Sequence, residues 1–282
     1  MEPVLRDIAD TARWVAFFRA EESERADAVF RDPFARRLAG ERGQQIAEAV
    51  AFSRANSWSF VARTHVFDRH VDEHVAAGYD TILNLAAGLD ARPYRMAVPP
   101  TLRWVEVDLP AMVSYKNSML IDAQPRCRLE RVALDLAARD ERQRLFEELN
   151  RTSTRVFVMT EGLVGYLADD EVASLAADLS GQSHFRRWAL DLLSPGLIAL
   201  AKAQMGSILN AASAPLRFGP SEGEGFFRQY GWTPLESTSL LKTAAVLNRV
   251  PPHMQQFAAY PEPEGPKGDM PWSGVCLFEN AD

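Results

Sequence analysis

Hydrophobic and polar positions follow two different periods along this chain, and the change falls near Tyr79. Residues 1–75 carry apolar positions at helical spacing and no strand-like alternation. The apolar segment 11–19 is followed by an Asp-Pro break at 32–33, and residues 47–74 have the pattern of one or two amphipathic helices that end at Gly78. We therefore expect residues 1–78 to form an α-helical N-terminal extension.

Short apolar runs alternate with helical patterns after Tyr79. The runs predict five strands, at 81–85, 103–108, 128–134, 155–160 and 188–193. The segments between them that have helical periodicity are 111–120, 137–149 and 169–180. Strands that alternate with helices form parallel βαβ units, so the sequence predicts an α/β fold with a doubly wound, mostly parallel, Rossmann-like sheet.

Residues 194–225 depart from this rhythm. Several Pro and Gly residues bracket a helical piece at 197–212, which we interpret as a lid insertion over a site. The tail from Leu240 is rich in Pro and Gly but keeps apolar runs, and it is expected to supply edge strands. The sequence has no internal repeat and no obvious linker. It therefore predicts one domain over 1–282, with its core at 79–193 and the last part of the sheet at 226–282.

Composition narrows the class of protein. A chain of 282 residues with 47% hydrophobic and 24% charged residues has the balance of an ordinary globular domain. Its net charge of −7 disfavours a nucleic-acid partner. Two cysteines make no disulfide framework, and neither a membrane span nor a secretory signal is indicated. We expect a cytoplasmic monomer or homodimer that acts on a small molecule.

The ends of the predicted strands carry the candidate chemistry. Ligands of open parallel sheets bind beyond the carboxyl ends of the strands. The small residues 86–88 follow the first strand and let a backbone approach a ligand closely. Carboxylates end or closely follow four successive strands: Asp90, Asp108, Asp135 and Glu161. A carboxylate at Asp108 can accept hydrogen bonds from both hydroxyls of a ribose. An acidic crevice of this kind favours a nucleoside that carries a positive sulfonium over a pyrophosphate.

A dinucleotide site is the alternative for such a sheet. It typically has a G-x-G-x-x-G turn, whereas this chain has only Gly88 there, with Ala86 at the position of the first small residue. Asp90 would also place a negative charge beside a pyrophosphate. An NAD(P)-dependent oxidoreductase is therefore the less favoured hypothesis.

Several segments together are more specific than any one turn. They are Thr-Ala-Arg-Trp-Val-Ala at 11–16, Asp-Pro-Phe-Ala at 32–35, Val-Ala-Arg-Thr at 61–64, Leu-Asn-Leu-Ala-Ala-Gly-Leu-Asp-Ala-Arg at 83–92, Trp-Val-Glu-Val-Asp-Leu-Pro at 104–110, Leu-Asp-Leu at 134–136 and Thr-Glu-Gly-Leu-Val-Gly-Tyr-Leu at 160–167. In these segments the chain resembles the leucine carboxyl methyltransferase-like family of class I methyltransferases, which use S-adenosylmethionine (SAM), and in particular its bacterial O-methyltransferase branch. The resemblance spans about residues 10–195 and fades beyond them.

The resemblance implies a role for each matching residue. Arg63 would grip the SAM carboxylate, which suits a guanidinium. Asp108 would hold the ribose hydroxyls, and Glu161 would lie beside the methionine amine or the sulfonium. The remaining members of the implied cofactor set are Ala86, Gly88 and Asp90 in the turn near the methionine part, and Asp135 and Leu136 at the adenine. One departure is visible, because the family often has Gly where this chain has Ala86.

The implied reaction is methyl transfer from SAM, by direct displacement, to an oxygen of a small molecule, with S-adenosylhomocysteine as the product. A carboxylate acceptor needs no base near pH 7, whereas a hydroxyl usually does. No residue stands out as a base; weak candidates are His65, Tyr166, His184 and His253. This favours a carboxyl group, such as that of a secondary metabolite. Methylation of a protein C-terminal carboxyl or of a phenolic hydroxyl, and a non-catalytic SAM-binding protein, remain as alternatives.

Two further patterns have structural interpretations. His70, Glu73 and His74 match the H-x-x-E-H arrangement of inverted zinc proteases. No third ligand is marked downstream, so we predict no metal and interpret these residues as a solvated helix face. The aromatic cluster Phe226, Phe227, Tyr230 and Trp232 suits an acceptor pocket or the core, and we favour the core.

Overall fold

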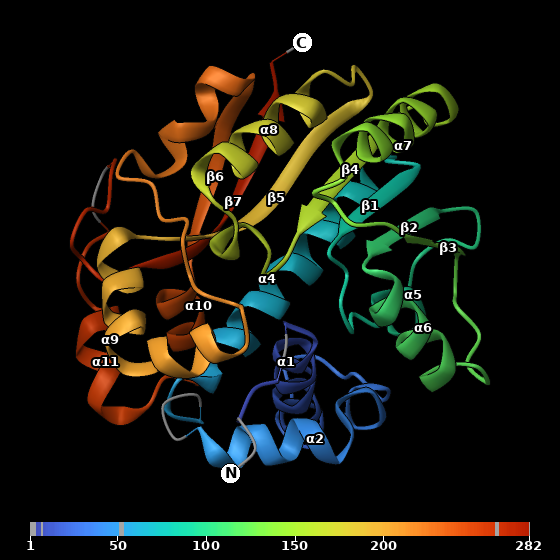
Figure 1. The fold of residues 1–282 in the computed structure, drawn as a ribbon. Coiled ribbons are helices and arrows are strands. Elements are labelled where there is room, and N and C mark those ends of the chain that lie inside the picture. Colours follow the sequence, from blue (N-terminus) through green and yellow to red (C-terminus); the bar gives the residue numbers. More distant parts are fainter. Residues whose placement is uncertain (1–3, 7, 51–53, 263–264, 282) are drawn as a thin grey trace.

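A seven-stranded sheet with helices on both faces organises the protein (Figure 1). The computed structural model describes residues 4–6, 8–50, 54–262 and 265–281. The strand order is β3-β2-β1-β4-β5-β7-β6. The strands are β1 (Thr81–Leu85), β2 (Arg103–Asp108), β3 (Arg128–Ala133), β4 (Val156–Thr160), β5 (Phe185–Leu193), β6 (Trp232–Ser239) and β7 (Ser273–Asn280). The predicted doubly wound α/β fold is confirmed.

The first five strands are parallel, and the strand order reverses between β1 and β4. Leu83 in β1 lies opposite Val105 in β2 on one side and Val158 in β4 on the other. Both β1 and β4 are buried along their whole length, which explains their continuous apolar runs. A reversal of this kind leaves a crevice beyond the carboxyl ends of the two strands.

Helices cover the two faces of the sheet. They are α4 (Ser57–Ala76), α5 (Arg92–Arg95), α6 (Pro110–Met119), α7 (Arg139–Thr152), α8 (Asp169–Ser180), α9 (Pro195–Ala211), α10 (Leu240–Val246) and α11 (Gln255–Ala258). One apolar core joins α7 and α8 to residues such as Leu83 and Trp188. A second core, on the opposite face, joins α4 and α10 to residues such as Ile82 and Phe157. Adjacent strand residues thus point to opposite cores, as the pleat requires.

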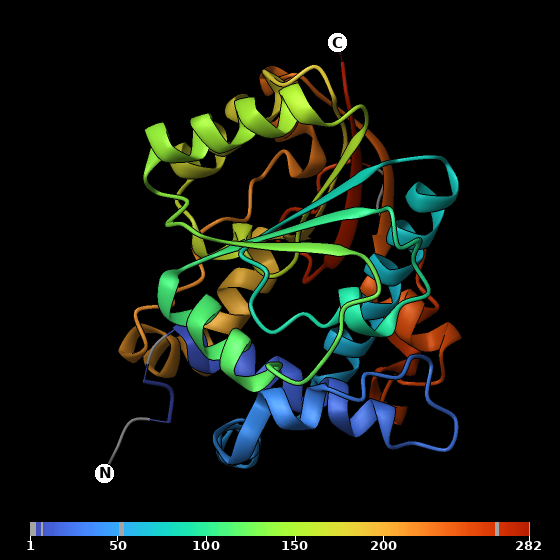
Figure 2. The same ribbon diagram turned by 90° about the vertical axis from the view of Figure 1, so that its right-hand side faces the viewer.

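The N-terminal residues form a helical layer below the carboxyl ends of the parallel strands. Helices α1 (Ile8–Ser23) and α2 (Ala35–Ala49) pack together, and both views place them side by side beneath the sheet (Figures 1 and 2). Gly78, with φ of +80°, follows α4 and turns the chain into β1. The predicted helical extension is therefore confirmed for the residues that the structure describes.

The C-terminal part completes the sheet in a way that the sequence prediction missed. Strand β6 is the edge, but β7 lies inside the sheet and pairs antiparallel with both β5 and β6. The prediction of edge strands from the tail is therefore wrong for β7. Its run of buried residues, which includes Val275 and Phe278, reflects cover on both faces. The short helix η2 (Gly223–Tyr230) brings Phe227 into the core, and Trp232 enters it from the start of β6, as favoured from sequence.

The histidines of the H-x-x-E-H pattern are buried, and the expectation of a solvated helix face is wrong. His70 is 0% exposed and His74 6% exposed. The His74 ring stacks on Phe157 of β4 at 4.2 Å between ring centroids, because this side of α4 packs on the sheet. Over the described part of the chain, no group of three or more His, Cys, Asp or Glu side chains is arranged to hold a metal ion. None of the helices described is long and apolar enough to cross a membrane.

Candidate functional site

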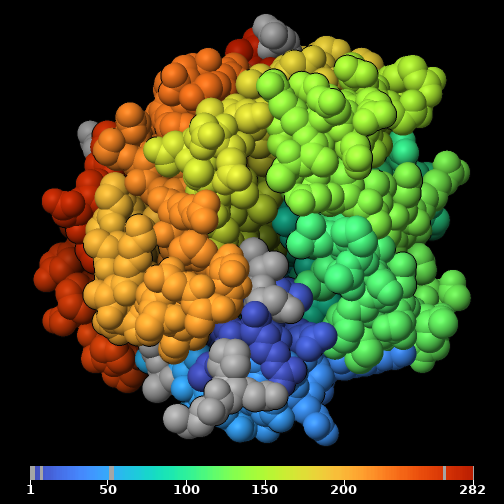
Figure 3. All heavy atoms as spheres, viewed as in Figure 1, coloured from blue at the N-terminus to red at the C-terminus, as the bar shows by residue number. Residues whose placement is uncertain are grey.

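A cavity of about 700 Å³ lies beyond the carboxyl ends of the parallel strands. Figure 3 shows the surface hollowed between α9, the N-terminal helices and the green segment around α6 and α7. The cavity is lined by every residue of the predicted cofactor set: Arg63, Ala86, Gly88, Asp90, Asp108, Asp135, Leu136 and Glu161. Residues that are far apart in sequence therefore meet in one place, as the strand ends predicted.

The turn after β1 has an unusual backbone. Gly88 has φ of +46° and Ala86 has φ of +52°, so both adopt the left-handed conformation. This conformation is ordinary for glycine but costs an L-residue roughly 1 kcal/mol or more. The turn is held by a hydrogen bond from the Gly88 N–H to Asp108 Oδ2 at 2.6 Å. Ala86 therefore places a Cβ in a backbone conformation that favours glycine.

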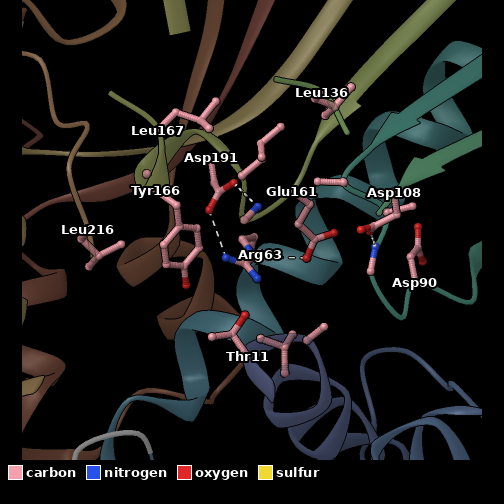
Figure 4. Close-up of a pocket in the computed structure, with 18 of the residues that line it drawn as sticks. Thr11, Arg63, Asp90, Asp108, Leu136, Glu161, Tyr166, Leu167, Asp191 and Leu216 are labelled. Carbon is pink, nitrogen blue, oxygen red and sulfur yellow. Dashed lines mark hydrogen bonds and ion pairs between the residues drawn. The ribbon is translucent and has the colours of Figure 1, made fainter. Parts of the chain in front are cut away.

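Asp108 ends β2 with its carboxylate directed at this turn (Figure 4). Its Oδ1 accepts from the Leu109 N–H at 2.7 Å, and its Oδ2 accepts from Gly88. Burial raises the pKa of this carboxyl above its ordinary value, against the opposing effect of the two N–H donors. Asp108 therefore braces the turn between β1 and α5 and does not cap α6.

Asp90 belongs to a buried ionic cluster behind the turn. Its carboxylate accepts from the Arg92 N–H at 2.9 Å and forms an ion pair with the Arg92 guanidinium at 3.0 Å. Burial alone would raise the pKa of Asp90, but Arg92, Lys116 and Arg95 outweigh it and lower the pKa to about 2. Asp90 is thus ionised and already paired, so it helps to build the turn that faces the cavity.

Arg63 is the cationic centre of the cavity (Figure 4). It lies on α4, and its guanidinium contacts Glu161 Oε1 at 3.2 Å and Asp191 Oδ2 at 3.0 Å. Burial would lower the pKa of Arg63, yet Asp191 and Glu161 raise it above its ordinary value. The other carboxylate oxygen of Glu161, Oε2, forms an ion pair with Arg92 Nη1 at 2.8 Å. Two arginines and two carboxylates therefore form a chain of ion pairs across the cavity.

Asp191 is a site residue that the sequence prediction missed. It lies near the end of β5, lines the cavity and accepts from the Gly162 N–H at 2.6 Å in addition to Arg63. The strand 188–193 was predicted, and a fifth carboxylate at a strand end was the available signal. Asp191 differs from the other carboxylates in its position, because it lies inside the apolar run of its strand. The others stand at the end of an apolar run or just after it.

Of the candidate bases, only Tyr166 lines the cavity among the described residues. Tyr166 lines the cavity beside Arg63; burial raises the pKa of its hydroxyl, which is hydrogen-bonded to Thr11. His184 lies at the opposite end of the sheet, where its Nδ1 is 2.8 Å from the Asn150 carbonyl oxygen, so its candidacy is wrong. His65 and His253 do not line the cavity either. The described residues that do so include no histidine, lysine or cysteine.

Asp135 and Leu136 follow β3 at the far side of the cavity from α9. Asp135 Oδ1 accepts from the Ala137 N–H at 2.9 Å, and the side chain is exposed. One carboxylate oxygen therefore shapes the turn before α7, and the other has no partner within that turn. Leu136 contributes an apolar surface beside it.

The chain is similar in sequence to known proteins. The sequence profile described as "Leucine carboxyl methyltransferase" matches residues 12–180. A Streptomyces coelicolor protein, provisionally named an S-adenosyl-L-methionine-dependent methyltransferase, is 34% identical over 234 residues, which cover 79% of this chain and 82% of the relative. A Streptomyces avermitilis protein with the same provisional name is 33% identical over 261 residues, covering 87% and 91%.

Solved structures share the fold over nearly the whole chain. A DUF574 family protein from Streptomyces avermitilis superposes with a TM-score of 0.63 at 16% identity, covering 96% of this chain and 97% of that one. A Thermobifida fusca protein, provisionally described as a methyltransferase, gives 0.61 at 15% identity, covering 99% and 96%. The fold is thus that of the Rossmann-like methyltransferases. The chain belongs to the leucine carboxyl methyltransferase family of SAM-dependent methyltransferases.

The residues of the cavity suit SAM. The turn at 86–88 brings backbone close to the ligand space, and Asp108 presents a partly buried carboxylate beside it. A buried guanidinium and two carboxylates stand where a zwitterionic amino-acid group needs opposite charges. Among the described residues that line the cavity, the only basic ones are arginines that already pair with carboxylates, so the site gives the NAD(P) alternative no support.

Proposed function

We propose that this protein transfers a methyl group from SAM to an oxygen of a small molecule, and that this oxygen belongs to a carboxyl group. The observation that carries the proposal is that the described residues lining the cavity include no histidine, lysine or cysteine. Of the carboxylates that line it, Glu161, Asp191 and Asp90 are engaged in ion pairs, and Asp108 accepts from two backbone N–H groups. A carboxylate acceptor near pH 7 needs no base, whereas a hydroxyl does.

Each residue of the cofactor side has a proposed task. When bound, SAM supplies a sulfonium methyl group and a neutral leaving group. Arg63 would bind the carboxylate of its methionine part, and Glu161 would accept from the amine. Asp108 would accept from the ribose hydroxyls, and Asp135 from the adenine amino group beside Leu136. Ala86 and Gly88 would offer a close backbone surface. These tasks follow from the charge and hydrogen-bonding capacity of the side chains.

The acceptor would enter from the other side of Arg63. There the cavity is bounded by α9, by α1 and by Tyr166. We propose that residues 194–225 and the N-terminal helices cover the reacting groups and exclude water. Their task would be alignment of the acceptor oxygen with the sulfur–methyl axis, which contributes most of the catalysis when little proton transfer is needed.

The first test separates cofactor binding from turnover. Calorimetric titration of the wild type should show micromolar SAM binding and no NAD binding. Asp108→Ala should weaken SAM binding at least tenfold, because two hydrogen bonds to a charged group are lost. Asp122→Ala is the matched control, because Asp122 is an exposed acid that contacts Arg37 far from the cavity. No SAM binding by the folded wild type would refute the cofactor assignment.

The second test concerns the acceptor oxygen. With SAM present, a screen of carboxylic acids and phenols should yield methyl esters from acids. The rate should be flat between pH 6.5 and 8.5, because the acceptor is already ionised. A rate that rises tenfold per pH unit with a phenol, and no ester from any acid, would favour the phenolic alternative. SAM binding with no turnover across the screen would favour a non-catalytic SAM-binding protein.

A further inference from the structure

The acceptor side of the cavity has the shape and chemistry of a lipid-like site. We propose that it binds an elongated apolar monocarboxylate, with the hydrocarbon body lying along α9 and the carboxylate at the Arg63–Tyr166 end. This inference rests on the proposed function, because it specifies the class of acceptor for that same reaction. It is carried by one face of α9 and by apolar residues of α1, α4 and the segment after α9 that line the same cavity.

Helix α9 presents a continuous apolar stripe to the cavity. Its four lining residues recur at every fourth position: Leu197, Ala201, Met205 and Leu209. Residues spaced by four share one side of a helix. The stripe runs over about 18 Å, at 1.5 Å per residue. The polar residues Lys202 and Gln204 are on the exposed side. The helix is therefore amphipathic, and part of its buried side borders open space.

Other apolar residues line the same cavity. They are Trp14 from α1, Phe60 from α4 and Leu216 from the segment after α9. Trp14 and Phe60 contact each other edge to face, with ring centroids 5.8 Å apart. Together with the stripe they enclose an apolar lobe next to Arg63, which we call the α9 lobe. A hydrocarbon gains roughly 0.8 kcal/mol for each methylene buried in such surroundings.

The α9 lobe is preformed because both ends of α9 are fastened. At the N-terminal end, Ser194 Oγ donates to the Met270 carbonyl at 2.6 Å. Gly196 packs so tightly there that an added Cβ would lie 2.0 Å from the Asp269 carbonyl oxygen. Beyond the C-terminal end, the Arg217 N–H donates to the Gly165 carbonyl at 2.7 Å. A fixed wall loses little entropy when a ligand binds to it.

The same surface argues against a peptide acceptor. A protein C-terminus would bring several backbone amides into the α9 lobe, and each buried amide without a partner costs about 1–3 kcal/mol. Of the seven residues that α9, β5 and the following segment contribute to the cavity, six are aliphatic or Met: Leu193, Leu197, Ala201, Met205, Leu209 and Leu216. The seventh, Asp191, is paired with Arg63. The six offer no side-chain partner for amides, whereas a hydrocarbon chain needs none.

The test uses straight-chain monocarboxylates from butanoate to dodecanoate, below their micellar concentrations. They are titrated into wild-type protein saturated with S-adenosylhomocysteine. Affinity should rise about threefold to fourfold per added methylene until the lobe is filled. Micromolar SAM binding with no dependence on chain length would overturn this inference and leave the proposed function standing. Failure of SAM to bind would instead overturn the proposed function.

Variants of α9 locate the binding. Met205→Glu places a charge in the stripe and should weaken decanoate binding at least thirtyfold, with the SAM affinity within twofold of wild type. Gln204→Glu adds the same charge on the exposed side and should change neither. If Met205→Glu does not fold, Ala201→Phe fills the lobe instead and should shift the best-bound acid to a shorter chain. Unchanged decanoate binding in the folded stripe variant would place the acids elsewhere and overturn the proposal.

Discussion

Arg63 on α4 and Asp191 near the end of β5 form an ion pair of 3.0 Å, although they are 128 residues apart in sequence. The pair ties the helical N-terminal part to the carboxyl end of the sheet. Both side chains are largely buried, at 14% and 11% exposed. Asp191 also accepts from the Gly162 N–H, so the pair fixes the loop that carries Glu161.

A double-mutant cycle should reveal strong coupling between these two residues. Arg63→Met should lower the free energy of unfolding by about 3 kcal/mol, because it leaves the largely buried Asp191 without a cationic partner and Glu161 with Arg92 alone. Asp191→Asn should cost much less in that background than in the wild type. The coupling energy expected from urea unfolding is about 1–3 kcal/mol.

The exposed pair Arg37–Asp122 is the control for this cycle. Its ionic contact of 2.6 Å lies in solvent, so the same cycle should give coupling too small to resolve. Additive effects of Arg63→Met and Asp191→Asn would mean that the ion pair contributes nothing beyond each residue's separate contacts.

Replacement of Ala86 by Gly should stabilise the protein. Ala86 has φ of +52°, and glycine removes the clash of its Cβ in this conformation. The expected gain is up to about 1 kcal/mol in urea unfolding, after the larger unfolded-state entropy of glycine is included. Ala87→Gly, next in sequence and buried, should instead lose about 1 kcal/mol or more. Equal losses in both variants would show that packing of the Ala86 methyl outweighs its backbone strain.

Acid should destabilise the protein through His70. Burial lowers the pKa of this imidazole from 6.5 to about 4; Arg69 and His74 act in the same direction, and Glu236 opposes them. The unfolded chain therefore takes up a proton at a higher pH than the native protein. This contribution to stability is complete above pH 6.5 and is lost as the pH falls towards 4. The loss reaches about 3 kcal/mol.

Urea unfolding between pH 5 and pH 7.5 measures this effect. His70→Leu keeps an apolar side chain in the buried position and should reduce the dependence of unfolding free energy on pH. Part of the dependence should remain, because burial also lowers the pKa of His74. His253→Leu, at an exposed position, should leave the dependence as in the wild type. Burial raises the pKa of Glu236, but hydrogen bonds from Arg69 and Thr238 outweigh it and hold the pKa below its ordinary value. An unchanged slope in His70→Leu would assign the acid sensitivity to other groups.

The sequence by itself determined the plan of the fold and one side of the site. Short runs rich in apolar residues placed β1 and β2 at their observed bounds, because Ala-Ala-Gly follows the first run and Leu-Pro ends the second. Carboxylates such as Asp108 and Glu161 could be assigned to one crevice, because parallel strands all end on the same edge of the sheet. These features depend on local pattern and on a general rule of topology.

Tertiary structure decided which residues of similar local pattern face the cavity. His184 and Tyr166 were equal candidates in the sequence, but they lie at opposite ends of the sheet. The apolar side of α9 has the spacing of any amphipathic helix, and only its packing beside Arg63 makes it a wall of the cavity. The local sequence around Asp191 predicts only a buried strand. Its role in the site depends on α4, which places the Arg63 guanidinium beside it. A contact between distant segments depends on how whole helices and strands pack together. The local hydrophobic periodicity of the sequence does not specify that packing.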